Sequence, residues 1–126
     1  MTDIVSQPDR VFQLWSYTVG MGRLLLRSVK TVSFASRIDI LFQNVQALKL
    51  PTVLHGLIIS SPDAKDIERI SLETGFLPEE GREFFLLNGA HYNGYIVAGV
   101  LATCEDAGDY FEPSKLWAAE PPSMPR

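Results

Sequence analysis

Residues 11–29, which read VFQLWSYTVGMGRLLLRSV, indicate the fold class most clearly. Residues 11–19 are almost all β-branched, aromatic or aliphatic, which is the composition of a β-strand. Gly20 and Gly22 follow, and two glycines so close together allow the positive φ angles of a tight reversal. Residues 23–29 then form a second apolar run. The stretch therefore predicts an antiparallel hairpin.

Further extended segments are expected along the rest of the chain. Each of them is either a short apolar run or an alternation of polar and apolar residues with a period of two. They cover residues 37–43, 45–50, 53–59, 83–88 and 94–104.

Residues 62–74 have the pattern of a helix. Ser61 is a suitable N-cap, Pro62 fits the first helical position, and Gly75 is well placed to end the helix. Apolar residues recur at intervals of three and give a narrow apolar stripe. A strand over residues 66–72 is the alternative interpretation.

Together these segments predict an α+β protein that is mainly antiparallel β-structure. About six or seven strands are expected in a sheet, a sandwich or a small barrel, with one helix near 62–74. Both faces of residues 94–104 are apolar, which predicts a central strand covered on both sides. We expect residues 1–10 to form a flexible arm, residues 11–119 a single globular domain, and residues 120–126, with three prolines, a disordered tail.

Charge, hydropathy and cysteine content restrict the classes of partner. The net charge is −4, with six Lys/Arg against three Asp/Glu in residues 1–58 and five against twelve in residues 59–126. The acidic character of residues 59–126 argues against a nucleic-acid partner, because binding to phosphates requires clustered Lys and Arg. The longest apolar run, residues 95–102, is much shorter than the roughly 20 residues that span a bilayer, so no membrane partner is expected. The N-terminus lacks secretory features and Cys104 has no second cysteine to pair with, which predicts a cytoplasmic location.

Four side chains are the candidate ligand-binding residues. Trp15 and Tyr17 share one face of the first predicted strand, where they can line a pocket or a dimer seam. His91 and Tyr92 belong to the polar loop 88–94, which places an imidazole and a phenol at a hairpin tip. Hairpin tips also favour such residues for conformational reasons alone.

Recognisable catalytic and metal-binding motifs are absent from the sequence. His55 and His91 have no partner at a diagnostic spacing and form no zinc motif. The carboxylates of residues 105, 106, 109 and 112 offer oxygen ligands for calcium, but without the spacing of a calcium loop they indicate a solvated turn. Cys104 has acidic neighbours and is interpreted as a small packed residue. We therefore expect no catalytic residue, no metal and no cofactor.

Three classes of function are compatible with these features, in decreasing order of support. The first is a non-enzymatic interaction module that forms a homo-oligomer or binds a protein partner, favoured by the uneven charge and the aromatic-rich strands. The second is a small-molecule-binding β-scaffold with Trp15, Tyr17, His91 and Tyr92 around its pocket. The third is a small enzyme that uses His55 or His91 with a carboxylate.

Overall fold

The computed structural model describes residues 3–118, with the backbone alone at residues 117 and 118. The expected tail, 120–126, lies outside the described residues. The elements are β1 (Asp3–Thr18), η1 (Val19–Met21), β2 (Arg23–Ser28), β3 (Arg37–Gln43), β4 (Ala47–Lys49), β5 (Val53–Ser60), α1 (Ala64–Thr74), β6 (Glu83–Asn88), β7 (Asn93–Ala98), β8 (Val100–Asp106) and α2 (Lys115–Ala118). The eight strands form one antiparallel sheet in the order β4-β7-β6-β5-β1-β2-β3-β8. The predicted α+β class is confirmed, with slightly more strands than expected.

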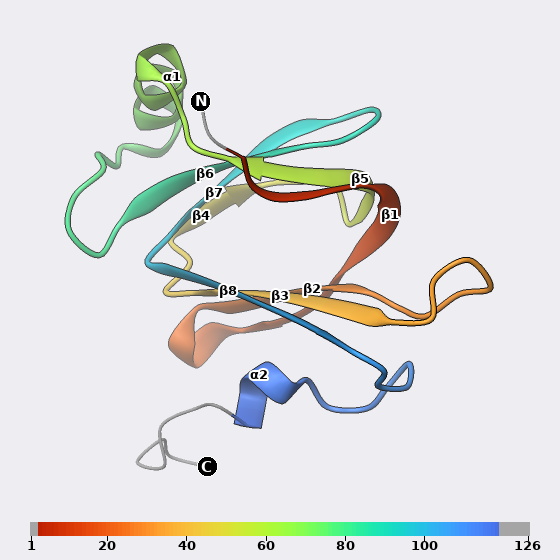
Figure 1. Ribbon diagram of the computed structural model, residues 1–126. Helices are drawn as coiled ribbons and strands as arrows, with labels where there is room; N and C mark the ends of the chain where they lie inside the picture. The colour runs from red at the N-terminus through yellow and green to blue at the C-terminus, as the bar shows by residue number, and fades with distance from the viewer. Residues whose placement is uncertain (1–2, 119–126) are drawn as a thin grey trace.

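The sheet folds over on itself into two layers: β4 to β7 form the upper layer, and β2, β3 and β8 form the lower layer (Figure 1). At one corner the long strand β1 bends, so that residues 3–13 pair with β5 and residues 13–18 pair with β2. At the opposite corner β7 and β8 are separated only by Gly99, whose amide donates to the carbonyl of Gln43. Strand pairing thus runs round a ring, as in the small barrel among the predicted arrangements. The break at Gly99 also divides the expected strand 94–104 in two, which raises the strand count.

Two apolar cores lie on opposite faces of the upper layer. The interior core, between the layers, contains Phe12, Leu24, Leu26, Ile38, Ile40, Phe42, Leu54, Leu57, Ile59, Phe85, Leu87, Ile96 and Ala98. The outer core lies beneath α1 and contains Ile70, Phe84, Leu86, Tyr95 and Val97. Successive residues of β6 and β7 therefore enter different cores, which explains why both faces of these strands are apolar. Strand β8 differs from the expectation for 94–104, because its residues are only partly buried.

Helix α1 begins later than the sequence pattern predicted. The N-cap is Asp63, not Ser61: the side chain of Asp63 accepts from the amide of Asp66, and the side chain of Asp66 accepts from the amide of Asp63. This reciprocal capping box satisfies two amides that the first turn leaves unpaired. The helix ends at Gly75, which has a left-handed φ of 80° as expected. No helix in the described part of the chain is long and apolar enough to cross a membrane.

The expectation of a flexible arm at residues 1–10 is wrong for residues 3–10, which form the first half of β1. Residues 3–7 pair with β5, and the ladder shifts between Gln7 and Val11. Pro8, which has no amide hydrogen to donate, therefore lies where the ladder has no regular backbone hydrogen bond. Arg10 is buried and donates to the hydroxyl of Ser28 and the carbonyl of Ser36. These contacts hold the segment in place although its sequence is polar.

Gly22 closes the β1–β2 turn and supports a test of this corner of the fold. Its φ is 57°, and an added Cβ would lie 2.9 Å from the backbone nitrogen of Val45. Because both the left-handed backbone and the clash oppose a side chain, Gly22→Ala should lower the free energy of unfolding by about 1–3 kcal/mol. The matched control is Gly20→Ala, where a Cβ meets nothing within 4 Å; it should change stability by about 0.5 kcal/mol or less. Urea unfolding curves measure both, and equal losses would contradict the close packing of this turn.

Candidate functional site

The outer face of the lower layer carries a cluster of four charged side chains, Arg27, Asp39, Arg37 and Asp106, which we call the arginine–carboxylate cluster. Cross-strand register brings them together, because Arg27 pairs with Asp39 and Arg37 pairs with Asp106. Arg27 donates to both oxygens of Asp39, from Nε at 2.7 Å and from Nη2 at 3.1 Å. Arg37 donates to both oxygens of Asp106 at 3.1 Å. Nε of Arg37 lies 3.9 Å from Oδ2 of Asp39 and so connects the two bidentate pairs.

The cluster is removed from water, since its four side chains are between 0% and 3% exposed. Burial raises the pKa of Asp106, but hydrogen bonds from Arg37 and the amide of Gly108 outweigh it, so the pKa lies below its ordinary value. Burial likewise lowers the pKa of Arg37, but Asp106 and Asp39 raise it by more. Both partners are therefore held in their charged forms.

The remaining donors of the cluster fix the backbone of residues 107–114. Arg37 donates from its Nη atoms to three backbone carbonyl groups, and Arg27 donates to a fourth. The accepting carbonyls are those of Asp109 at 2.8 Å, Glu112 at 2.6 Å and Pro113 at 3.3 Å for Arg37, and that of Tyr110 at 3.0 Å for Arg27. The amide of Gly108 donates to Asp106. A segment without regular strand or helix is thus held by two buried guanidinium groups.

This fixed segment presents two aromatic rings beside Trp15. Phe111 is 81% exposed and Tyr110 47% exposed. Ring centroids are 5.0 Å apart for Trp15 and Tyr110, 5.9 Å for Trp15 and Phe111, and 4.5 Å for Tyr110 and Phe111. The guanidinium of Arg27 lies 5.1 Å from the Trp15 ring. A groove of about 410 Å³ runs here, which we call the aromatic groove; it is lined by Trp15, Ser16, Leu25, Arg27, Phe111, Glu112, Pro113 and Ser114.

Of the four predicted ligand-binding residues, only Trp15 lines the aromatic groove. A register shift between Leu14 and Ser16 places Tyr17 opposite Leu24, so a bulge separates Tyr17 from the face of Trp15. Tyr110 and Phe111 are not among the residues predicted from the sequence to bind a ligand. The available signal was a pair of adjacent aromatic residues within an acidic turn.

The predicted residues His91 and Tyr92 lie instead in the turn between β6 and β7. The hydroxyl of Tyr92 donates to the carbonyl of Gly56 at 2.8 Å, and burial raises the pKa of Tyr92 to about 12. Its hydroxyl therefore stays protonated and anchors the turn to β5. His91 and His55 are both exposed. Within residues 3–118 neither imidazole forms a hydrogen bond or an ion pair.

The acidic side chains within residues 105–112 contact different partners and do not gather around one point. Asp106 binds Arg37, Asp109 lies 3.2 Å from the ammonium group of Lys30, and Glu112 accepts from the amide of Asp109. Among the described residues no group of three or more potential ligands is arranged to hold a metal ion. Cys104 is half-buried; burial raises the pKa of its thiol, and the charges of Asp106 and Asp39 add to the effect.

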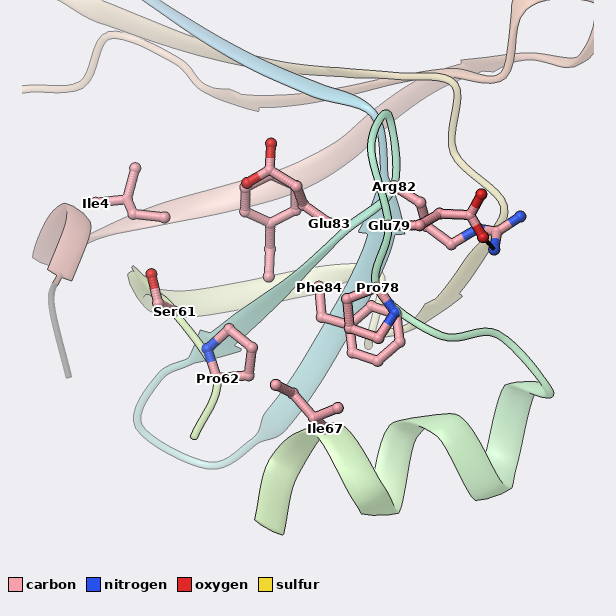
Figure 2. Close-up of a pocket in the computed structure, with 10 residues that line it drawn as sticks. Ile4, Ser61, Pro62, Ile67, Pro78, Glu79, Arg82, Glu83 and Phe84 are labelled. Atoms are coloured by element: carbon pink, nitrogen blue, oxygen red, sulfur yellow. Dashed lines mark hydrogen bonds and ion pairs between the residues drawn. The ribbon is translucent and has the colours of Figure 1, made fainter. Parts of the chain in front are cut away.

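A second concavity lies between α1, the start of β1 and β6 (Figure 2). Its volume is about 420 Å³, and its lining residues are Ile4, Ser61, Pro62, Ile67, Pro78, Glu79, Arg82, Glu83, Phe84 and Phe85. Glu79 and Arg82 form an ion pair of 2.7 Å at its rim, while Glu83 is exposed. We call this concavity the helix cleft.

Comparisons with protein-family models, curated proteins and solved structures gave no match, so the functional argument rests on the geometry of this chain.

The low pKa of Asp106 predicts a specific response to acid. A carboxyl group whose pKa is lower in the folded state contributes stability that is complete above its unfolded pKa, about 3.9, and is lost as pH falls through the folded value. Asp106→Asn leaves Arg37 buried without its charged partner and should cost about 3–5 kcal/mol at neutral pH. The variant should also lose less further stability than the unmodified protein when the pH is lowered below about 4.

Thermal unfolding followed by circular dichroism at a series of pH values measures this response. Asp9→Asn, which changes an exposed carboxyl of β1, is the matched control and should retain the acid response of the unmodified protein. An acid response that is equally steep in Asp106→Asn would contradict the assigned role of the Arg37–Asp106 pair.

Proposed function

We propose that this protein is a non-enzymatic protein-interaction module whose aromatic groove binds an extended segment of a protein partner. The observation that carries the proposal is the 81% exposure of Phe111 on a segment whose backbone is fixed by buried arginines. Aromatic residues and arginine supply most of the binding free energy at protein interfaces. Here the rings of Tyr110 and Phe111 contact that of Trp15, which lies over the guanidinium of Arg27.

The fixed backbone favours binding because it lowers the entropic cost of association. A loop that must order itself when a partner arrives loses part of the interaction free energy in doing so. Residues 109–113 are already held by four carbonyl hydrogen bonds from Arg27 and Arg37. The rings of Tyr110 and Phe111 are therefore presented in one backbone geometry before a partner binds.

The lining of the groove indicates the chemistry of the partner. Trp15, Leu25, Phe111 and Pro113 offer apolar contacts for aliphatic or proline side chains. Glu112 is an exposed carboxylate in the same lining, which suits a basic residue beside the apolar ones. A peptide that combines proline or aliphatic residues with one arginine or lysine matches both features.

Selection of displayed random peptides against the intact protein tests this function. Peptides recovered should be apolar or proline-containing with a basic residue, and Phe111→Ala should weaken their binding about tenfold or more, because a central aromatic contact is lost. Leu77→Ala removes another exposed apolar side chain, outside the groove, and should leave binding unchanged. Isothermal titration calorimetry measures the affinity of a selected peptide for the unmodified protein and for both variants. A selection without binders, or binders indifferent to Phe111→Ala, would refute the proposal.

A second candidate function is small-molecule binding in the helix cleft. Its volume lies in the range of ligand pockets, and Ile4, Ile67 and Phe84 give it apolar walls beside the carboxylate of Glu83 (Figure 2). An apolar amine is the class of ligand that this combination suits. Thermal-shift screening with such amines should give stabilisation that Ile67→Ala reduces. Leu72→Ala, on the exposed side of α1, is the control and should not reduce it; equal reduction by both variants would exclude the cleft.

A further inference from the structure

We propose that the segment bound by the aromatic groove is residues 119–126 of a second copy of this chain, so that the protein associates with itself through its own proline-containing segment. This inference rests on the proposed function, because it names the partner of the same groove. Residues 119–126 read AEPPSMPR and lie outside the residues that the structure describes.

The spacing of the prolines supports this choice of occupant. Pro122 and Pro125 are three residues apart, which forms the Pro-x-x-Pro pattern that docks in aromatic-lined grooves. A polyproline II helix has three residues per turn, so two prolines at this spacing lie on one face about 9 Å apart. The rings of Trp15 and Phe111, with Pro113 beside them, give the groove the type of wall that such a face contacts.

Charge supports the same pairing. Arg126 directly follows Pro125, and the exposed carboxylate of Glu112 lines the groove. A basic residue at one end of the segment and an acidic residue in the groove lining favour one direction for the bound segment.

Chain connectivity favours a second copy over the groove of the same molecule. Ser114 lines the groove, and α2 follows at once and leads the chain to Ala118. Pro121 and Pro122 come three and four residues later. Only residues 119 and 120 stand between α2 and these prolines, which is a short length of chain in which to reverse and run back over its own groove. Exchange between two copies gives two equivalent groove contacts in a symmetric dimer.

The first experiment measures the oligomeric state of the full chain by analytical ultracentrifugation over a range of protein concentrations. We expect a dimer that dissociates on dilution. The double variant Pro122→Ala/Pro125→Ala should be monomeric at concentrations where the unmodified chain is dimeric. Pro121→Ala, which changes a neighbouring proline outside the three-residue spacing, is the matched control and should dimerise like the unmodified chain.

The second experiment tests the groove directly. The sequence has two tryptophans, so Trp117→Phe leaves Trp15 as the fluorescent reporter. In the full-length Trp117→Phe/Pro122→Ala/Pro125→Ala protein, a synthetic peptide of residues 119–126 should shift the emission of Trp15 saturably. Adding Phe111→Ala should weaken the peptide's affinity about tenfold or more.

Any one of the following results would overturn the inference. A chain that is monomeric at every concentration shows no association, and a dimer untouched by the double variant uses another surface. A change in Trp15 emission caused by the double variant but independent of protein concentration shows that the segment binds within its own molecule. If selected peptides bind the groove while the 119–126 peptide does not, this inference fails and the proposed function stands. If neither binds, both fail.

Discussion

The buried ion pairs Arg27–Asp39 and Arg37–Asp106 are the constraint on which the lower layer depends. Taking such charges out of water costs several kcal/mol per ion, and their attraction offsets this cost only when the geometry is good and the remaining donors find acceptors. Both pairs are bidentate, and the leftover donors reach the carbonyls of residues 109–113. Residues 107–114 and the cluster therefore need each other, since either without the other leaves buried polar groups unpaired.

The two outer faces of the sheet are covered by different kinds of interaction. Helix α1 covers the upper layer through apolar contacts between Ile70 and residues such as Phe84 and Tyr95. Such packing is not directional and tolerates small shifts between helix and sheet. The lower layer is covered through directional hydrogen bonds from Arg27 and Arg37, and the guanidinium of Arg37 fills the space where a side chain at position 108 would lie. An irregular segment held in this way has little freedom to move.

Local sequence signals predicted the elements but not the contacts that build the groove. Alternation and apolar runs identified most strands, and Gly75 marked the end of α1, because these features depend on neighbouring residues. Arg27 and Asp39 look like solvent-facing residues of half-buried strands, and Tyr110, whose carbonyl accepts from Arg27, lies 83 residues beyond it along the chain. The prediction that Trp15 binds a ligand depended only on its being an aromatic residue on one face of a strand. Its separation from Tyr17 required a bulge that the alternation does not reveal.

Residues 107–114 are held through their backbone, so the stability of the fold and recognition at its surface depend on different groups of this segment. Arg27 and Arg37 bind backbone carbonyls, which every amino acid supplies, so the fold places few demands on the side chains at positions 110–112. Stability alone gives no reason for a phenylalanine that is 81% exposed at position 111, next to a half-exposed tyrosine. Two such rings side by side add apolar surface that the monomer leaves in contact with water. The proposed binding of a partner at the groove therefore gives the side chains at these positions a reason that the stability of the fold does not supply.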